Sequence, residues 1–516
     1  MKRFWIFFIS IIFSASLNAQ DLKSFAFTNR NNFSSLNEFR HSQTMNKNFI
    51  YYYSSHLKKD FLFSTDTPKR KHNMYGNLTS DDTLYNRRYC SLIPAVEILG
   101  VNFLTWSIDR YVFDADYARV SPETWKYNMK EGWEWDTDRF GINFIGHPYS
   151  GTLFYNSARA NGYNFFGSIP FAIGGSLMWE YFGENSKPSY NDLINTPING
   201  IFLGEILYRL SENVLDDQSR GGERFFRELS ATVLSPMVGF NRLVQGKMFR
   251  VTHKEVYQKE PCNISIFAGI HKVNTNKEFL TGNFNEILNL QVDYGNPFEK
   301  RNKKPFDVFR IRLDLSYGQG TDLLNNISGY GNLITKNSKA GAIDLLHGLF
   351  QYYDYWDNPT FELGTIGFGE GVISKLKVFK KSFLYTSLHI GVAPFAGSST
   401  RFGPDTLAFR NYNFGGGMEG KFEATFNLSE AAAISFNAYY FWIHTYQGMP
   451  GDNFVGILKP KITIRIIKNI SVGLEQYVYI NDRYTPNRKA IHQIQTEQKI
   501  FLLLYLENRK RSGHYE

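Results

Sequence analysis

The chain has 516 residues, a formal net charge of +9 and a mean hydropathy of −0.33, and 17% of its residues are aromatic. This hydropathy argues against a polytopic helical membrane protein, which needs apolar runs of about 20 residues. Low hydropathy with many aromatic residues is typical of an outer-membrane β-barrel. The positive net charge favours anionic lipid or polysaccharide as a partner, and because the charges are dispersed, we expect no nucleic acid.

The first 19 residues have the pattern of a secretory signal peptide. Lys2-Arg3 precedes an apolar run from Phe4 to Ala15 and a cleavage site at Leu17-Asn18-Ala19. No Cys follows this site, which argues against a lipoprotein, and the apolar run is short for a membrane anchor. Because Lys2 and Arg3 would be removed, the mature chain would carry a net charge of +7.

Residues 20–93 are rich in Asn, Ser and Lys and have no sustained periodicity, which predicts a polar, partly disordered lead-in. The chain has two cysteines, Cys90 and Cys262. An oxidising periplasm permits a disulfide, but the sequence leaves open whether they pair. Neither cysteine has partners at the spacing of a zinc site.

A helical domain is expected at about 94–250, beginning with Pro94 as a first helical residue. The apolar stretch 95–113 is just long enough to cross a membrane. It contains polar residues that are costly in lipid, so we expect it to be buried against protein. These residues are Glu97, Asn102, Asp109 and Arg110. Ser121 and Pro122 predict the cap and first turn of the next helix.

The segment 133–209 sets charged and amide residues within apolar, glycine-rich helical text. Gly200 and Gly204 share one helix face, which predicts close contact with another helix. Glu205 and Arg209 have the i, i+4 spacing of an ion pair. The expected helices are 148–160, 166–183, 197–213 beginning at Thr196-Pro197, and 221–235.

From about residue 260 the period of the sequence changes from helical to two, which predicts antiparallel strands and an α+β chain. An even number of such strands after a signal peptide fits a transmembrane β-barrel at 260–516. The twelve expected strands lie near 263–272, 285–295, 306–317, 325–334, 341–355, 360–374, 383–395, 411–426, 433–445, 454–466, 470–480 and 498–507.

Three strands predict which side chains face lipid. Apolar residues alternate with charged ones, and a soluble sandwich with the same alternation would hide its apolar face. The lipid-facing set includes Phe309, Ile311, Leu313, Leu315, Met418, Phe422, Ile462 and Ile464. The lumen-facing set includes Arg310, Arg312, Asp314, Glu419, Lys421, Glu423, Lys461 and Arg465. Both signs of charge in the lumen predict crossing ion pairs or a plug rather than a wide porin.

The first candidate site comprises polar residues on the helices of 133–209. His147 is a candidate general base or ligand, and Glu180 and Asp192 are candidate acidic partners. Glu180 follows an apolar run and needs a partner when ionised, and Arg159 and Arg209 are the obvious ones. The other members are Asn156, Glu184, Asn191 and Glu205. The alternative is a structural network of ion pairs and amides that holds short helices together.

Two other stretches are weaker candidates. Asp136 and Asp138 have the alternation of calcium ligands, but the glycine and distal Glu of a hand-type loop are missing. We expect them to cap the following helix, and the sequence predicts no metal or cofactor. Ser387 and His389 share one face of a strand, as in a lipid-hydrolysing site. Because Leu388 belongs to the lipid-facing set, we expect them to form lumenal hydrogen bonds instead.

A series of short motifs occurs in order along the helical domain. They are Gly132-Trp133-Glu134-Trp135-Asp136, His147-Pro148-Tyr149-Ser150-Gly151, Asn156-Ser157-Ala158-Arg159, Trp179-Glu180-Tyr181-Phe182-Gly183-Glu184, Asn191-Asp192-Leu193, Gly204-Glu205 and Asn241-Arg242-Leu243. Together they resemble a bacterial envelope family known as domain of unknown function 3943, over about 75–250. The resemblance implies an envelope location but no mechanism. The barrel is similar to twelve-stranded outer-membrane phospholipases in architecture only, because their serine-histidine-asparagine motif is absent.

We therefore expect an outer-membrane protein whose helical domain is a plug in the lumen or packs at the periplasmic mouth. The first function class is the binding or passage of an envelope lipid, glycan or small solute, without chemistry. The alternative is an envelope-lipid hydrolase or transferase that uses His147 with an acidic partner. The expected partners are outer-membrane lipid and the barrel-insertion machinery.

Overall fold

A computed structural model describes residues 92–252, 256–257, 259–273, 284–318, 322–401, 411–429 and 431–508. The expected signal peptide, the lead-in and Cys90 lie outside these residues, and Cys262 is a buried free thiol. The chain divides into two compact units. Among the described residues, the first comprises Ala158–Ser168 and Tyr208–Gln258. The second comprises Leu92–Ser157, Ile169–Leu207 and the chain from Lys259 onward.

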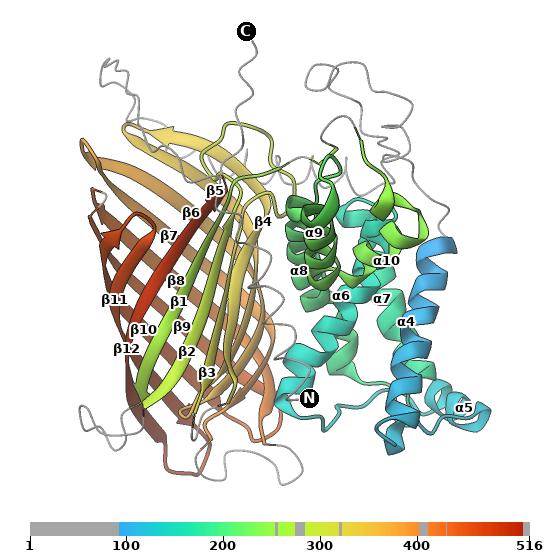
Figure 1. The fold of residues 1–516 in the computed structure, drawn as a ribbon. Coiled ribbons are helices and arrows are strands. Elements are labelled where there is room, and N and C mark those ends of the chain that lie inside the picture. The colour runs from blue at the N-terminus through green and yellow to red at the C-terminus, as the bar shows by residue number, and fades with distance from the viewer. Residues whose placement is uncertain are drawn as a thin grey trace, which may run out of the picture. The chain divides into compact units, whose positions relative to one another are not determined.

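Helices precede strands along the chain, as the sequence predicts (Figure 1). The helices are α4 (Leu92–Tyr111), α5 (Pro122–Lys130), α6 (His147–Ala160), α7 (Phe165–Phe182), α8 (Tyr190–Val214), α9 (Gly221–Leu234) and α10 (Pro236–Val244). A π-helical turn at Ile142–Gly146 leads into α6, and short 3-10 turns lie at Asp116–Ala118 and Lys247–Phe249.

Helix α4 differs from its prediction as a buried helix. Only Pro94, Ile98 and Asn102 are buried, and the Asn102 side chain donates to the Gly175 carbonyl of α7 at 3.3 Å. The inward face is therefore narrow, and most of the large apolar side chains of α4 are exposed. Within the described residues, α4 is the one helix that is long and apolar enough to cross a membrane, judged by length and composition.

The two predicted helix starts have different outcomes. Ser121 caps α5: its Oγ accepts the Thr124 N–H at 3.3 Å, and Thr124 Oγ1 accepts the Ser121 N–H at 2.9 Å. The start of α8 at Thr196-Pro197 is wrong, because Pro197 lies inside a helix that begins at Tyr190. The helix starts earlier because Ser189 Oγ accepts the N–H of Asp192 at 3.2 Å, as an N-cap does.

Helices α6 and α8 approach each other backbone to backbone, as Gly200 and Gly204 predict. A Cβ on Gly200 would lie 2.6 Å from Gly151 of α6, and a Cβ on Gly151 would lie 1.8 Å from the Thr196 carbonyl oxygen. Thr152 Oγ1 also donates to the Gly200 carbonyl at 3.2 Å. Small residues and side chain–backbone hydrogen bonds of this kind are typical of helix packing within membranes.

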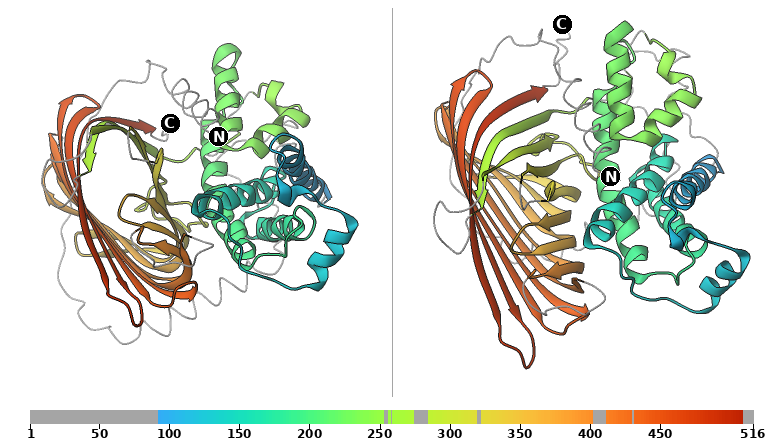
Figure 2. Two further views of the ribbon diagram at one scale, coloured as in Figure 1. Left: turned by 90° about the horizontal axis from the view of Figure 1, so that it is seen from below. Right: turned by 60° about the horizontal axis from the view of Figure 1, so that its bottom comes forward.

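The strands form a closed antiparallel barrel of twelve, so the predicted count and class are confirmed (Figures 1 and 2). Each strand pairs with its sequence neighbours, and β1 pairs with β12 to close the ring. The strands are β1 (Cys262–Val273), β2 (Phe284–Tyr294), β3 (Phe309–Tyr317), β4 (Leu324–Ala340), β5 (Ile343–Asp357), β6 (Glu362–Phe379), β7 (Ser382–Ser399), β8 (Asn413–Leu428), β9 (Ala432–Gln447), β10 (Asp452–Ile467), β11 (Ile470–Tyr484) and β12 (Ile491–Asn508).

The barrel exposes apolar side chains outward and buries polar ones inward. On β8, Met418 is exposed while Glu419, Lys421 and Glu423 are buried, as their alternation predicts. Further exposed apolar residues are Leu388, Ile390, Val392, Phe422, Ile462, Ile464, Leu474 and Leu502. A closed antiparallel barrel with an apolar outer face is the transmembrane barrel of outer-membrane type.

The two ends of the barrel differ in their connections. At one end four of the five turns are short: Gly341–Ala342, Lys380–Lys381, Ser429–Ala431 and Lys468–Asn469. The barrel also begins with β1 and finishes with β12 at this end. The opposite end has longer connections, including the one between Ser399 and Asn413. Short turns mark the periplasmic end of such barrels, and long loops mark the extracellular end.

The first unit has its own buried ion network. Arg242 of α10 contacts Asp217 and Glu228 at 2.6 Å each, and Arg224 of α9 lies 3.2 Å from both carboxylates. The predicted helix 221–235 corresponds to α9, whereas α10 was not anticipated.

Candidate functional site

His147 lies between two carboxylates at the start of α6. Its Nε2 is 3.4 Å from Asp138 Oδ2 and 3.4 Å from Asp192 Oδ1. The side chains of His147 and Asp192 are 12% and 5% exposed, whereas that of Asp138 is 46% exposed. The structure therefore joins the first and second candidate sites of the sequence into one cluster, with Asp138 as its open side.

A short parallel bridge brings the acidic segment to the start of α8. Glu134 pairs with Ser189: the Glu134 N–H donates to the Pro188 carbonyl at 3.0 Å, and the Tyr190 N–H donates to the Glu134 carbonyl at 2.9 Å. This pairing places Asp136 beside α8, where its N–H donates to Asn191 Oδ1 at 3.2 Å.

Hydrogen bonds from asparagine amides hold the carboxylates of Asp136 and Asp192 in place. Asn143 donates to Asp136 Oδ1 at 3.1 Å, and Asn191 donates to Asn143 Oδ1 at 2.8 Å and to Asp192 Oδ1 at 3.0 Å. Asn195 donates to the Asn143 carbonyl, and Asn199 donates to Asn195 Oδ1 at 2.6 Å. Sequence reasoning missed Asn143, Asn195, Asn199 and Ser189. The four-residue spacing of Asn191, Asn195 and Asn199 was the available signal, since it places three amides on one helix face.

Glu180 accepts the backbone N–H of Ser189 at 2.7 Å. Burial, reinforced by the charge of Glu184, raises the pKa of Glu180 to about 8. Glu184 accepts from Trp179 Nε1 at 2.7 Å and from Ser186 Oγ at 3.1 Å. Burial raises the pKa of Glu184 as well, although His147 opposes it. Of the two carboxyl groups, Glu180 therefore tends to keep its proton near neutral pH.

The charge state of His147 follows from its carboxylates. Burial disfavours the imidazolium, but Asp192, Asp138 and Asp136 outweigh this effect and raise the pKa of His147 well above its usual value. Burial likewise raises the pKa of Asp192, and His147 opposes that rise. The cluster thus retains at least one proton at neutral pH, shared between the imidazole and the carboxylate beside it.

Three groups of this cluster have the spacing of metal ligands. One ligand atom each from Asp136, Asp138 and His147 lies within 4.8 Å of the other two. The same groups also satisfy one another: Asp136 Oδ1 accepts the Asp138 N–H at 3.3 Å, and Asp138 faces His147. These contacts take the place of the helix-capping role predicted for the two aspartates.

Four candidate residues lie elsewhere. Glu205 is fully buried and accepts from Tyr155 Oη at 2.8 Å, and Asn156 is buried on α6. In the first unit, Arg159 donates to the Tyr163 carbonyl at 2.6 Å and lies 4.2 Å from the Tyr208 ring. Arg209 belongs to the same unit, so the predicted pairings of Arg209 with Glu205 and of either arginine with Glu180 stay predictions.

The cluster adjoins the barrel within the second unit. Asn143 donates to Tyr412 Oη at 2.7 Å, and Tyr412 Oη donates to the Asp138 carbonyl at 3.0 Å. Tyr353 of β5 donates to the Phe144 carbonyl, and Gln351 of β5 donates to the Ile198 carbonyl at 3.0 Å. The helices of this unit are therefore attached to the wall formed by β5 and its neighbours.

These contacts lie on the outside of the wall. On β5, Tyr352 and Asp354 point into the lumen, where they contact His389 and Lys421. Tyr353 alternates with them and therefore points outward. The plug that sequence reasoning allowed is wrong for these helices, because the residues that hold them face away from the lumen.

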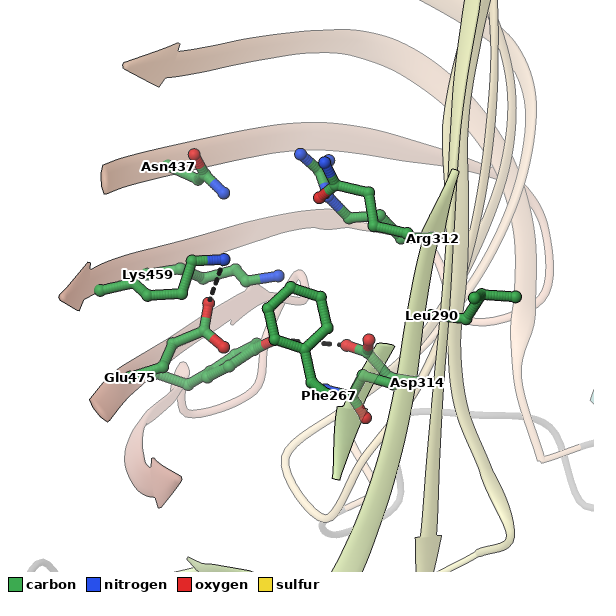
Figure 3. A pocket seen from close by; sticks show the side chains of 11 residues that line it. Phe267, Leu290, Arg312, Asp314, Asn437, Lys459 and Glu475 are labelled. Atoms are coloured by element: carbon green, nitrogen blue, oxygen red, sulfur yellow. Dashed lines mark hydrogen bonds and ion pairs between the residues drawn. The ribbon is translucent and has the colours of Figure 1, made fainter. Parts of the chain in front are cut away.

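Among the described residues, side chains of the barrel's own strands pair with one another across the lumen, as the inward charges predict. Arg310 and Arg312 of β3 pair with Glu423 of β8, and Tyr477 of β11 donates to Asp314 of β3 at 3.2 Å. Figure 3 shows side chains from different strands extending into the same small space. The cavity there has a volume of about 20 Å³, which suits a single water molecule.

The predicted lumenal orientation of the third candidate is confirmed. Ser387 and His389 are buried, whereas Leu388 is exposed on the outer face. His389 Nδ1 lies 3.1 Å from Tyr352 Oη, and its ring lies 4.7 Å from that of Tyr330. His389 is therefore held in an aromatic cluster inside the barrel, away from the acyl chains outside.

Residues 132–237 match the family model described as a domain of unknown function, DUF3943. This confirms the resemblance, over a shorter stretch than 75–250. The DUF3943 segment contains the whole cluster around His147. No match was found among curated proteins.

Solved barrels that are similar to this chain span about half of it. The NanC porin is 7% identical, covers 47% of this chain and 98% of its own, and has a TM-score of 0.26. Outer membrane phospholipase A from Escherichia coli is 11% identical, covers 48% of this chain and 91% of its own, and has a TM-score of 0.26. The outer membrane channel DcaP of Acinetobacter baumannii is 7% identical, covers 48% of this chain and 95% of its own, and has a TM-score of 0.20. At these TM-scores the likenesses carry no argument about activity.

Proposed function

We propose that this is an outer-membrane protein in which the barrel is a closed anchor and the DUF3943 segment binds an envelope ligand at the His147 cluster. The ion pairs of Arg310 and Arg312 with Glu423 carry this proposal. They join walls that are not neighbours in the barrel, and the cavity beside Arg312 measures about 20 Å³, which argues against solute passage through this part of the lumen.

The ligand class follows from the open side of the cluster. Asp138 is the exposed member, and buried carboxylates and an imidazole lie behind it. A site of this composition favours hydroxyl or cationic groups over a free phosphate, because the carboxylates repel anions. We therefore propose the sugar or amine portion of an envelope lipid or glycan as the bound group.

The test is native mass spectrometry of protein purified in mild detergent and offered outer-membrane lipid extract. Asp138→Asn and His147→Gln are expected to reduce retained lipid at least fivefold. Glu131→Gln, at an exposed position nearby, is expected to retain it. Equal retention by all variants would refute binding at this cluster. A steady pore conductance of the wild-type protein in planar bilayers would refute the closed anchor.

The second candidate is an envelope-lipid hydrolase or transferase, favoured by the contact of His147 with Asp138 and Asp192. A general base must be neutral, whereas these carboxylates raise the pKa of His147 and favour its protonated form. His147 would therefore act as a proton donor. An altered phospholipid or lipid A profile in cells that carry His147→Ala, with the barrel assembled normally, would support this enzyme over a binding protein.

A further inference from the structure

We infer that α4 lies within the membrane beside the barrel, with its exposed face toward the lipid acyl chains. This inference is independent of the ligand bound at His147. It differs from the periplasmic placement that the sequence suggests. It rests on where the helices contact the barrel and on which face of α4 is left uncovered.

Phe144 and Phe202 of the helical part contact the outer wall of the barrel. Phe144 packs against the barrel where β6 and β7 carry Gly364 and Gly397, and a Cβ on either glycine would lie within 2.4 Å of its ring. Phe202 of α8 packs on Tyr353 of β5 and on Phe306, with ring centroids 5.7 and 5.4 Å apart. These contacts occupy outer wall that lipid would otherwise cover, since the remaining outer face is apolar and exposed.

A chain of helix–helix contacts leads from the barrel wall to α4. Helix α8 contacts α6 through Gly200 and Gly151, and α6 contacts α7 through Phe154 and Gly175. Helix α7 in turn accepts the Asn102 side chain of α4 at its Gly175 carbonyl. Helix α4 is thus joined to the barrel through the other helices of the unit and not through its own exposed face.

The exposed face of α4 is apolar. Leu92, Val96, Leu99 and Phe103 recur at spacings of four and three residues, so they form one continuous stripe. All four are more than half exposed, and Phe103 is 67% exposed. A helix of 20 residues is about 30 Å long, which matches the thickness of a bilayer's hydrocarbon core.

The C-terminal end of α4 has the chemistry of a membrane interface. Exposed aromatic residues gather there and on the segment that follows: Tyr111, Tyr117, Trp125 and Tyr127. Arg110, Asp114 and Arg119 form ion pairs beside them. Aromatic and charged residues together mark the level of lipid headgroups. Lipid is therefore the occupant that continues the apolar outer face of the barrel onto α4.

The test uses single cysteines in a full-length Cys90→Ser, Cys262→Ala background, labelled with a fluorophore and reconstituted into vesicles containing brominated phosphatidylcholine. Leu99→Cys and Val96→Cys probe α4. Ile390→Cys, on the outer face of β7, is the lipid control, and Lys489→Cys, exposed in the connection between β11 and β12, is the water control. Retained heat-modifiable migration on gels verifies a folded barrel in each variant.

We expect the two α4 probes to be quenched by brominated lipid within twofold of Ile390→Cys and to resist iodide. Iodide quenching like that of Lys489→Cys would place α4 in water and overturn the inference. Protection from both quenchers would mean that protein covers the stripe, either a second copy or another part of the chain, and would equally overturn it.

Discussion

Arg312 of β3 and Glu423 of β8 form a two-point ion pair across the lumen, with Nη1 2.7 Å from Oε1 and Nη2 3.0 Å from Oε2. Tyr439 of β9 completes the arrangement, since its hydroxyl donates to Glu423 Oε1 at 2.8 Å. Opposite walls of the barrel are thereby tied together by buried charges. Within the described ranges, this part of the barrel interior is consequently a buried polar core.

Replacement of Glu423 by Ala is expected to weaken and open the barrel. It would leave Arg310 and Arg312 without this carboxylate, and breaking a buried ion pair in this way costs about 3–5 kcal/mol. Urea unfolding should show the lower stability, and planar-bilayer recordings should show new conductance. Asp344→Asn is the matched control, because its pair with Lys339 is exposed and 3.8 Å long. Unchanged stability of Glu423→Ala would contradict the central role of this pair.

The helices of the second unit are expected to lose stability as pH rises because of Glu180. Its pKa is raised from about 4.5 to about 8 on folding, so its contribution is fully present below pH 4.5 and lost as pH rises through 8. Hydrogen exchange of α7 and α8 amides should therefore quicken as pH rises from about 4.5 to about 8 and level off above that, after correction for intrinsic rates. Glu180→Gln should flatten this dependence. A wild-type profile as flat as that of the variant would rule out a raised pKa.

Gly151→Ala is expected to separate α6 from α8, because its Cβ would lie 1.8 Å from the Thr196 carbonyl oxygen and the backbone would have to shift. Gly174→Ala on α7 is the control, since a Cβ there meets nothing within 4 Å. The control should be neutral or more stable by about 0.5–1 kcal/mol, as expected for Ala over Gly in a helix. Limited proteolysis of the helices reports both effects, and equal resistance of the two variants would argue against close packing.

Phe144→Ala is expected to detach the helices of the second unit from the wall while the barrel persists. Phe144 is fully buried, and truncation of such a side chain costs about 3–5 kcal/mol. Ile142→Ala, in the same π-helical turn but 40% exposed, should cost little. Faster hydrogen exchange in α6 and α8, with unchanged heat-modifiable migration, is the expected result. Loss of the barrel in Phe144→Ala would mean instead that the helices are needed for barrel folding.

Local patterns in the sequence predict the barrel well but not the surroundings of its wall. The alternation around Glu419, Lys421 and Glu423 defines inner and outer faces without knowledge of distant contacts. In the sequence, Tyr353 and Tyr355 on β5 resemble the aromatic residues that line a membrane interface. Tyrosine is suited both to contact with lipid headgroups and to packing against helices, so the residue type does not reveal which of the two it contacts. No local pattern distinguishes the two environments.

The candidate site was predicted in part for a similar reason. His147, Glu180 and Asp192 stand out as polar residues in apolar text, and the structure connects them through Asp192 and Ser189. The joining of Asp138 to His147 depends on the bridge between Glu134 and Ser189, which are distant in sequence. A single bridge between two residues leaves no periodic pattern in the sequence from which it could be predicted.

Gly364 of β6 and Gly397 of β7 are directly opposed across the two strands, and together they form the depression that receives the ring of Phe144. This depression exists only after the two strands have paired. The ribosome makes Phe144 long before it makes either glycine. The attachment of Phe144 to the wall therefore has to follow the pairing of two strands that are synthesised after it, so this contact cannot form while the helices alone have left the ribosome.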